Sequence, residues 1–502
     1  MIIQLLVLLP ILHQSHSAPQ QNLGSGGQFG SFYPQQNGDN LEEYCYRKDE
    51  DPYIYFGTKT SYDSLTRRGG QQHIVPGCQP VQFWSLNRHG TRLPKAAKIQ
   101  KLRDLQYLRA DLVRNYEEKK SYPAIGKLCF DDYNLLRRWR WNDNITEDKA
   151  ASLTQQGINE LRLIARRYKA KFPQLLNQPY SDQTYYFQYT QTDRTHDSYQ
   201  AYIEGLFNQD FYKVHANTFG NDMLLKPYRN CKAWQERIDD NPETDKQYRE
   251  FLESEDYQKM LQQVSRRLGF NYPLNVSTIQ DVYDMCRFNK AWQLDQPSSW
   301  CVAFTKEHLK LLEYAEDLKG YYNTGYGSPL AKYIGCGPIQ DMFRKFEKTV
   351  QGYPDGNKAS GLFTHAATMQ AVYSTLGIAK DQTLLRADNY RQHQQKRLWR
   401  TSVINPFAAN LVAVLYQCQS SNQQNPTFKV MFFLNEEPIE EFLGCSLGLC
   451  DWETVDQNFR EIVENCNVDA FCDGSSSAQR VTLSIGLRIL FSAVLLFSAL
   501  IS

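Results

Sequence analysis

Short apolar runs alternate with amphipathic stretches along the central part of the chain. Residues 81–86 predict a buried strand, and residues 95–120 predict a helix, because isoleucine and leucine recur there at three- and four-residue steps. Further strands are predicted at residues 185–189 and 361–363, each followed by a polar loop and a helix. This repeated order is typical of an α/β fold with a doubly wound, mainly parallel sheet.

The pattern continues beyond these elements. The second strand is followed by a helix predicted at residues 198–207, and the helix after the third strand is expected to stop at Gly377. Two more strands are predicted at residues 411–415 and 428–434. Because ligands of such sheets bind outside the carboxyl ends of the strands, polar residues just past each strand are candidates for a site.

A change in polarity divides the chain into regions. Residues 208–347 are more polar and more helix-like than their surroundings. We predict that they form an α-helical cap, because such an insertion commonly walls a catalytic pocket. The α/β domain would then consist of residues 41–207 and 348–470.

The amino-terminal end has the features of a secretory signal peptide. An apolar run at residues 2–12 is followed by small residues that suit cleavage before Ala18, although no basic residue precedes the run. The run is too short for a membrane span, which favours a signal peptide at residues 1–17. The Gln/Gly/Ser-rich segment 18–40 is predicted to be disordered.

The carboxyl-terminal end carries a second export pattern. Small residues around Gly474 and Ser475 precede a short polar spacer and a mostly apolar tail at residues 483–502. This is the order of a glycosylphosphatidylinositol (GPI) attachment signal, so we predict that residues 475–502 are removed and that a lipid anchors the protein to the outer leaflet, on the extracellular face of the plasma membrane. A transmembrane helix is disfavoured, because Arg488 interrupts the tail and no basic anchor follows it.

Cysteine usage and glycosylation motifs agree with export. The chain has 12 cysteines, an even number that favours disulfides in a secreted protein, and their spacing offers no zinc site. Asn144 and Asn275 begin Asn-X-Thr/Ser acceptor motifs, whereas Pro426 excludes Asn425. We therefore expect glycans at Asn144 and Asn275.

Net charge restricts the partners. The 56 Lys and Arg residues nearly balance the 55 Asp and Glu residues, for a formal net charge of +1. No global field would attract nucleic acid or an anionic membrane surface, so affinity for an anionic substrate requires a local cluster. Carboxylates do not cluster as metal ligands do, which disfavours a metal-dependent enzyme.

One basic cluster follows the first predicted strand. His89 lies between Arg88 and Arg92 in the run Arg-His-Gly-Thr-Arg-Leu-Pro. A neutral imidazole is a good nucleophile, and guanidinium groups neutralise and orient phosphoryl oxygens. Gly90 is expected to let the backbone approach the ligand closely.

Two further polar residues follow the other strands. Arg194 lies just past the second strand and His365 just past the third. Alone, the arginine would suggest a surface salt bridge and the histidine a satisfied core residue. Because parallel strands end at one edge of a sheet, that edge would bring both beside His89, which favours a shared site.

Several blocks of the sequence resemble a known family. Residues 88–94 are similar to the active-site signature of the histidine acid phosphatases. Residues 55–62, Tyr-Phe-Gly-Thr-Lys-Thr-Ser-Tyr, resemble the amino-terminal segment of the multiple inositol polyphosphate phosphatases, a branch of that family. The resemblance covers nearly the whole chain between the termini, with further blocks at residues 153–157, 192–194, 365–368 and 434–436.

The resemblance implies a phosphoric monoester hydrolase that removes phosphate from inositol polyphosphates without a cofactor. His89 would be the transiently phosphorylated nucleophile, and Arg88, Arg92 and Arg194 would bind the phosphoryl oxygens. His365 would add a further donor. These roles suit phosphoryl transfer, which needs in-line positioning and neutralisation of the oxygens.

The neighbouring lysines bear on the choice of substrate. Lys59 and Lys95 are candidates for binding additional substrate phosphates, although solvated surface lysines are an equal alternative. The sequence leaves open which phosphate is removed and whether a bisphosphoglycerate is also a substrate.

One block departs from the family pattern. The inositol phosphatase branch carries a glutamate that protonates the leaving oxygen at the position where this chain has Ala367. Losing a general acid typically costs about 10²–10⁴-fold in rate. Glu436, Glu437 or a bound water remain open as replacements, whereas the His196-Asp197 pair, which resembles the donor pair of other histidine acid phosphatases, lies in the wrong block.

Two functions remain open. The first is a surface-anchored inositol polyphosphate phosphatase that is slowed by Ala367. The second is a catalytically impaired protein that binds inositol phosphates or acts as an interaction protein at the cell surface. The intact histidine and arginine set favours the first, and the alanine favours the second.

Overall fold

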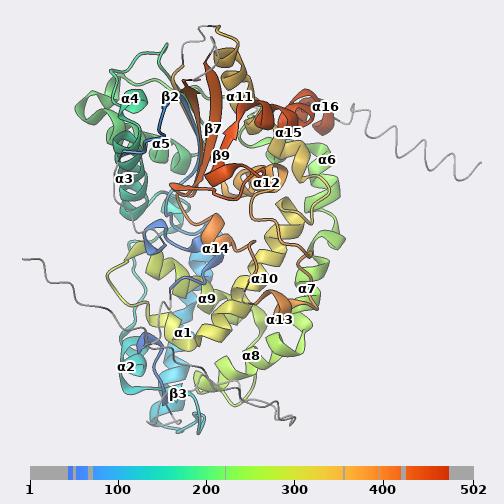
Figure 1. Cartoon of the computed structure of the whole chain (residues 1–502). Helices are drawn as coiled ribbons and strands as arrows, with labels where there is room; N and C mark the ends of the chain where they lie inside the picture. Colours follow the sequence, from blue (N-terminus) through green and yellow to red (C-terminus); the bar gives the residue numbers. More distant parts are fainter. Residues whose placement is uncertain are drawn as a thin grey trace, which may run out of the picture. The chain divides into compact units, whose positions relative to one another are not determined.

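Seven strands form one sheet in the computed structural model of the chain (Figure 1). In its parallel part, β5 Ala359–Thr364 lies between β4 Tyr185–Tyr189 and β2 Cys78–Arg88. Arg88 pairs in register with Thr364, so β2 and β5 end at the same edge of the sheet. The three strands predicted here are confirmed, and the residues just past them are brought together.

The other half of the sheet is antiparallel. β6 Asn410–Cys418 pairs with β2 and with β7 Thr427–Leu434, and β7 pairs with β8 Glu437–Pro438 and β9 Leu449–Asp451. The α/β class is confirmed, but the sheet is mixed rather than mainly parallel. Residues 419–426 are too few for a crossover, which takes a dozen or more residues, so β6 and β7 pair antiparallel.

Helices cover both faces of the sheet. On one face α3 and α5 pack together and share a core with Phe83, whereas α11 and α12 pack on the other face with the adjacent Trp84. Alternate side chains of a strand point to opposite faces, which explains the division. The bounds of these helices are Gln155–Lys171 (α3), Asp193–Phe207 (α5), Ala331–Val350 (α11) and Ala366–Leu376 (α12).

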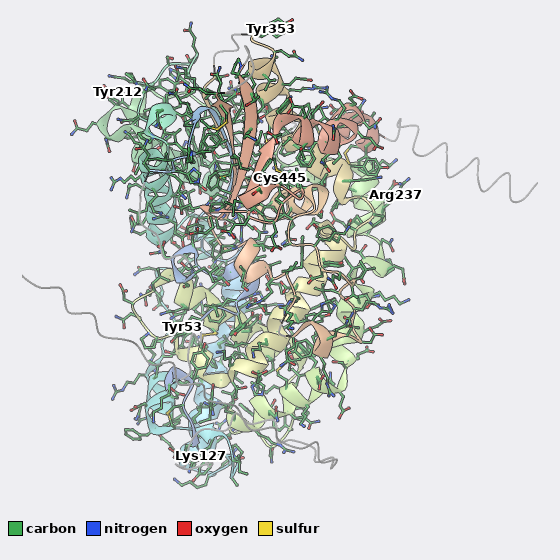
Figure 2. The ribbon with its side chains drawn as sticks, viewed as in Figure 1. Tyr53, Lys127, Tyr212, Arg237, Tyr353 and Cys445 are labelled. Carbon is green, nitrogen blue, oxygen red and sulfur yellow. A yellow bond between two sulfur atoms is a disulfide. The ribbon has the colours of Figure 1, made fainter. Side chains whose placement is uncertain are left out.

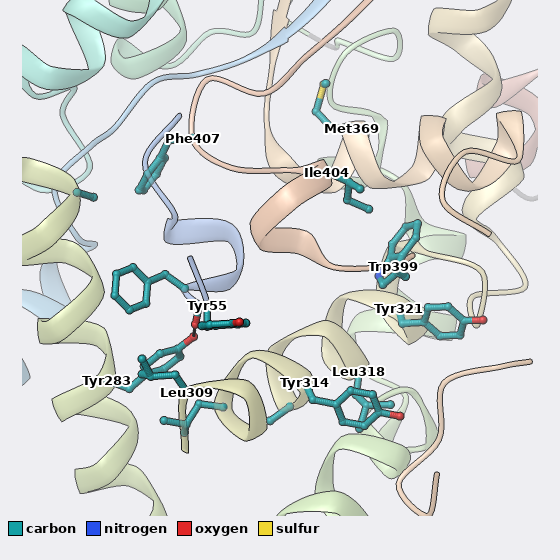
Figure 3. Packing of buried hydrophobic residues seen from close by; sticks show 14 of the residues in the cluster. Tyr55, Tyr283, Leu309, Tyr314, Leu318, Tyr321, Met369, Trp399, Ile404 and Phe407 are labelled. Atoms are coloured by element: carbon teal, nitrogen blue, oxygen red, sulfur yellow. Dashed lines mark hydrogen bonds between the residues drawn. The ribbon is translucent and has the colours of Figure 1, made fainter. Parts of the chain in front are cut away.

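Several of the other helices, among them α9 and α10, extend the core on the Trp84 face of the sheet, and part of that core is seen in Figure 3. Tyr283 of α9 lies there beside Tyr55, and Tyr314 of α10 lies beside Leu318. The bounds are Ala96–Glu117 (α1), Phe130–Arg138 (α2), Pro173–Leu176 (α4), Lys232–Trp234 (α6), Lys246–Glu253 (α7), Glu255–Arg267 (α8), Val276–Trp292 (α9), Lys306–Thr324 (α10), Tyr390–His393 (α13), Thr401–Ile404 (α14), Trp452–Glu464 (α15) and Val468–Cys472 (α16).

Helices inside and outside residues 208–347 pack against each other. α1 packs on α9, whereas α11, which begins within that range and continues to Val350, packs on α12 and β2. The cap and its boundaries at residues 207/208 and 347/348 therefore stay a prediction.

Helix limits follow the expected pattern with one exception. α12 ends at Leu376, where Gly377 adopts a left-handed φ of 83°, as predicted. α5 begins at Asp193 rather than at residue 198, so Arg194 lies in the first helical turn and not in a loop. The first turn of α5 is polar, and hydrophobic periodicity cannot reveal such a turn.

Six disulfides join all 12 cysteines, which confirms the prediction. Cys78–Cys418 fixes the pairing of β2 with β6, and Cys445, labelled in Figure 2, bonds Cys450 of β9. The others are Cys45–Cys129, Cys231–Cys472, Cys286–Cys301 and Cys336–Cys466. A small two-stranded sheet, β1 Glu43–Tyr44 with β3 Lys127–Leu128, lies beside the Cys45–Cys129 disulfide.

The structure describes residues 43–48, 53–65, 72–220, 222–353, 357–394, 396–419 and 426–473. The predicted signal peptide, the segment 18–40 and the predicted GPI signal with Gly474 and Ser475 lie outside these ranges. Within them, no helix combines the length and apolarity needed to cross a membrane. Asn144 and Asn275 are exposed, and their glycosylation stays a prediction.

Candidate active site

The loop after β2 fixes His89 with one ring nitrogen unprotonated. His89 is only 3% exposed, and its Nδ1 lies 2.9 Å from the carbonyl oxygen of Gly90. A carbonyl oxygen only accepts, so Nδ1 carries the proton and donates, and Nε2 keeps its lone pair. The backbone N–H of His89 donates to the carbonyl of Thr364 at 3.1 Å, which ties the loop to the end of β5.

The surroundings keep this ring neutral. Burial is the largest influence, and the charge of Arg88, a protonated state of His365 and the charge of Arg92 would each oppose a second positive charge. Together they hold the pKa of His89 well below its ordinary value. A neutral imidazole with a free Nε2 lone pair is a competent nucleophile at mildly acidic and neutral pH.

Arg88 is anchored by the backbone on two sides. Its Nη1 donates to the carbonyl oxygens of Thr58 (2.8 Å) and Asn405 (2.7 Å), and its guanidinium lies 4.8 Å from the ring centre of Phe407. Burial and the neighbouring Arg92 lower the pKa of Arg88 to about 9. An anion placed here would relieve that repulsion.

Arg92 and Arg194 leave donors available. Arg92 Nη1 donates to the carbonyl of Leu93 at 2.7 Å, and burial, followed by the charge of Arg194, lowers its pKa to about 10. The Nε atoms of Arg88, Arg92 and Arg194 are buried with no hydrogen-bond partner among the described residues. Three guanidinium groups with unused donors can bind the oxygens of one phosphoryl group.

His365 lies beside His89, with a ring-centre separation of 5.5 Å. Its Nδ1 faces Arg194 Nη2 at 3.2 Å, and its Nε2 lies 2.9 Å from Thr190 Oγ1. Because arginine only donates, Nδ1 accepts and Nε2 carries the proton. His365 is also the N-cap residue of α12, whose positive end therefore adds to the field at the site.

A pocket of about 590 Å³ adjoins this cluster at the start of α12. Thr58, Ala366 and Ala367 line it on the side of the histidines, and Lys59 and Lys95 line it further out. The carboxylates among its described lining residues are Asp284 and Glu316. Its size lies in the ordinary range for small-molecule sites.

Glu316 neutralises one wall of the pocket. It forms ion pairs with Lys59 (2.9 Å) and with Arg287, which also binds Asp284 at 2.5 Å. Although burial opposes ionisation, Arg287 and Lys59 hold the pKa of Glu316 below its ordinary value, so it stays charged. Lys59 is thus partly neutralised, whereas Lys95 is exposed on the pocket rim.

Comparisons with known proteins agree with this geometry. Residues 82–433 match the model of the histidine phosphatase superfamily (branch 2). A protein of Drosophila melanogaster named multiple inositol polyphosphate phosphatase 1 is 36% identical over 434 residues, covering 86% of this chain and 90% of that protein. The chain belongs to branch 2 of the histidine phosphatase superfamily. The prediction of a phosphoric monoester hydrolase of this family is confirmed.

Solved structures share the histidine phosphatase fold. The phytase from D. castellii is 16% identical, with a TM-score of 0.63 over 84% of this chain and 87% of that one. The multiple inositol polyphosphate phosphatase of Bifidobacterium longum, solved as a complex with inositol hexasulfate, is also 16% identical. Its TM-score is 0.51, over 77% of this chain and 92% of that one.

In this histidine phosphatase the five predicted catalytic residues lie at one sheet edge, and Gly90 has a packing role that the sequence did not predict. A Cβ on Gly90 would lie 2.5 Å from the carbonyl oxygen of Gly157. Gly90 therefore lets α3 pack against the loop, and its expected part in ligand approach stays a prediction.

Sequence reasoning missed Glu160. This carboxylate of α3 is fully buried and accepts from Thr91 N (2.8 Å), Thr91 Oγ1 (2.9 Å) and Ser61 Oγ (2.9 Å). It joins the nucleophile loop to the segment containing Lys59, and burial raises its pKa to about 7. The available signal was a lone acid on the apolar helix face that also bears Ile164.

The acids considered as replacements for Ala367 lie elsewhere. Glu436 is 2% exposed, and its two oxygens bind Arg167 (2.8 and 2.9 Å) and the Tyr62 hydroxyl (2.7 Å). Glu437 is exposed on β8, and neither glutamate lines the pocket. His196 and Asp197 pair with each other at 3.1 Å, each 42% exposed, on α5.

Proposed function

We propose that this chain hydrolyses inositol polyphosphates through a phosphohistidine at His89. The observation that carries the proposal is the free Nε2 lone pair of a neutral His89 amid three guanidinium groups with unused donors. The adjoining pocket, with lysines on its walls, would accommodate the rest of a polyphosphorylated ring. Relatives named for this activity support the choice of substrate.

The chemistry proceeds in two displacements. His89 Nε2 attacks phosphorus, a nitrogen–phosphorus bond forms, and the bond to the inositol oxygen breaks. A water molecule then attacks the phosphohistidine and releases inorganic phosphate, which returns the imidazole to its neutral form. Arg88, Arg92 and Arg194 neutralise the equatorial oxygens in both steps.

We further propose that the first step is slow for alkoxide leaving groups. The leaving oxygen needs a proton, and Ala367 supplies none. The pocket carboxylates, Asp284 and Glu316, are ion-paired with Arg287, and the pKa of each is held below its ordinary value, so neither holds a proton to give. The proton would then come from water.

The first test replaces the nucleophile. His89→Ala should abolish phosphate release from inositol hexakisphosphate and any acid-labile phosphoenzyme, while secretion and thermal stability are retained. Undiminished turnover in that variant would contradict the proposal.

A binding role is the second candidate, and the ion-paired pocket acids favour it. If wild-type protein binds inositol hexakisphosphate by calorimetry but releases no phosphate from it over hours, the chain acts as a receptor for the ligand. Measurable phosphate release that depends on His89 would instead establish the enzyme.

The cellular location belongs to the proposal as well. The apolar amino terminus, the disulfides and the carboxyl-terminal pattern support a secreted protein held on the extracellular face of the plasma membrane by a GPI anchor. Phosphatidylinositol-specific phospholipase should release it from intact cells. Retention, with peptides of residues 483–502 in the mature protein, would identify a transmembrane helix.

A further inference from the structure

A loop at residues 222–229 is fastened to the peptide that carries His365. The carbonyl oxygen of Leu225 accepts from Thr364 Oγ1 (2.5 Å) and from Thr368 Oγ1 (2.7 Å), which lie on either side of His365 in the sequence. Asp222 Oδ1 accepts from the backbone N–H of Leu225 at 2.8 Å. The backbone leading into the next residue, Lys226, is therefore held beside the peptide that carries His365.

Lys226 lies among cations from three parts of the chain. Its side chain is half-buried, and no hydrogen bond or ion pair of its Nζ occurs within the described ranges. Burial, followed by the charges of Arg194, Arg229 and Lys95, lowers its pKa to about 8, although the charge of Asp222 acts in the opposite direction. Like charges this close repel each other, and a bound anion would offset that repulsion.

Two lysines that line the pocket differ from Lys226, which lies outside its lining. Lys59 is paired with Glu316 at 2.9 Å, and Lys98 is paired with Asp281 and Asp284, each at 2.7 Å. Those cations already have carboxylate partners, so an incoming phosphate would have to compete with them. Lys226 and Lys95 carry no such partner among the described residues, so their charge remains for a ligand.

We propose that Lys226, together with Lys95, binds a second phosphate of the substrate while the first lies at His89. The inference rests on the proposed function, because it requires a substrate with at least two phosphates on one small scaffold. The two ammonium groups donate charge-assisted hydrogen bonds to that phosphate, which orients the ring and selects polyphosphates over monophosphates.

The test compares two substrates in matched variants. Lys226→Met keeps the aliphatic length and removes the charge. The control is Lys232→Met, a change of the same charge at an 82% exposed lysine on α6 that is paired with Glu236 at 3.7 Å. In Lys226→Met we expect the ratio of kcat/KM for inositol hexakisphosphate to that for p-nitrophenyl phosphate to fall about 10-fold, mainly through KM, because a charged hydrogen-bond partner is lost. In the control the ratio should stay within about twofold.

Binding separates this inference from the proposed function. Calorimetry measures the binding of inositol hexakisphosphate to His89→Ala and to His89→Ala/Lys226→Met. Binding that is about 10-fold weaker in the double variant supports the second phosphate site, even if the wild-type protein does not hydrolyse the ligand. Normal turnover with an unchanged substrate ratio in Lys226→Met overturns the site and leaves the proposed function standing. An equal loss on both substrates, or no measurable binding, also overturns it.

Discussion

Replacing Ala367 with glutamate should raise turnover selectively, according to the leaving group. Ala367 is the second residue of α12 and lines the pocket that adjoins His89, the position where the resembled branch carries its acid. An aryl phosphate leaves as a stabilised phenolate and needs little protonation. An inositol phosphate leaves as a strongly basic alkoxide, so it should gain far more from the new carboxylic acid.

The size of the gain follows from the protonated fraction of the new side chain. A glutamate has an ordinary pKa of about 4.3, and the start of a helix beside cations holds it at or below that value. At pH 5 at most about one sixth of it is protonated. Multiplied by the usual 10²–10⁴-fold contribution of a general acid, this upper limit gives an increase in kcat of about 10-fold to 10³-fold, which shrinks as the pKa of the new side chain falls or the pH rises.

The assay measures kcat for inositol hexakisphosphate and for p-nitrophenyl phosphate at pH 5 and pH 7. Ala367→Gln serves as the control, because it has nearly the same shape and no acidic proton. Equal gains in the glutamate and glutamine variants would refute the reasoning. Fast wild-type hydrolysis of inositol hexakisphosphate that Ala367→Glu does not improve would show that another group donates the proton.

Three further outcomes are expected. Glu160→Ala leaves the buried donors of Thr91 unsatisfied and should lower the free energy of unfolding by about 3 kcal/mol, measured by denaturant titration. A change below about 1 kcal/mol would contradict the role of Glu160 in joining the nucleophile loop to the segment that contains Lys59. Removing the Cys78–Cys418 bond by double alanine substitution should cost about 2–5 kcal/mol, seen as a lower Tm in non-reducing buffer. Because the pKa of His89 is lowered, its imidazole stays neutral as the pH falls. A plot of kcat/KM for an aryl phosphate against pH should therefore show no decrease with a midpoint near ~6.5, the ordinary pKa of histidine. A midpoint there would refute the argument that burial keeps His89 neutral.

The sequence predicted the elements whose signals are local. Strand β4 was placed with its observed bounds, and the end of α12 followed from Gly377, because apolar runs and a left-handed glycine act over a few residues. The direction of β6 and β7 was not predicted, because apolar runs are alike in parallel and antiparallel strands. The polar first turn of α5, which carries Arg194, was not predicted, because that turn shows no hydrophobic periodicity.

The nucleophile loop illustrates a different limit. Arg88, His89 and Arg92 were found because they are adjacent in sequence, and His365 because it follows a strand that pairs with theirs. Glu160 was missed, although it binds that loop, because a single buried acid is recognised only when its donors are known. Its nearest donors, Thr91 and Ser61, are 69 and 99 residues away along the chain.

The positions of countercharges decide which lysines can bind substrate, and sequence order hides them. Lys59 lies within a block that resembles the family, yet its partner Glu316 comes from α10, 257 residues later. Lys226 lies in a loop with no motif, yet the threonines on both sides of His365 hold that loop against the active site. Coulomb energy depends on distance in space, so a lysine beside guanidinium groups without a carboxylate partner is the better phosphate ligand, whatever its motif.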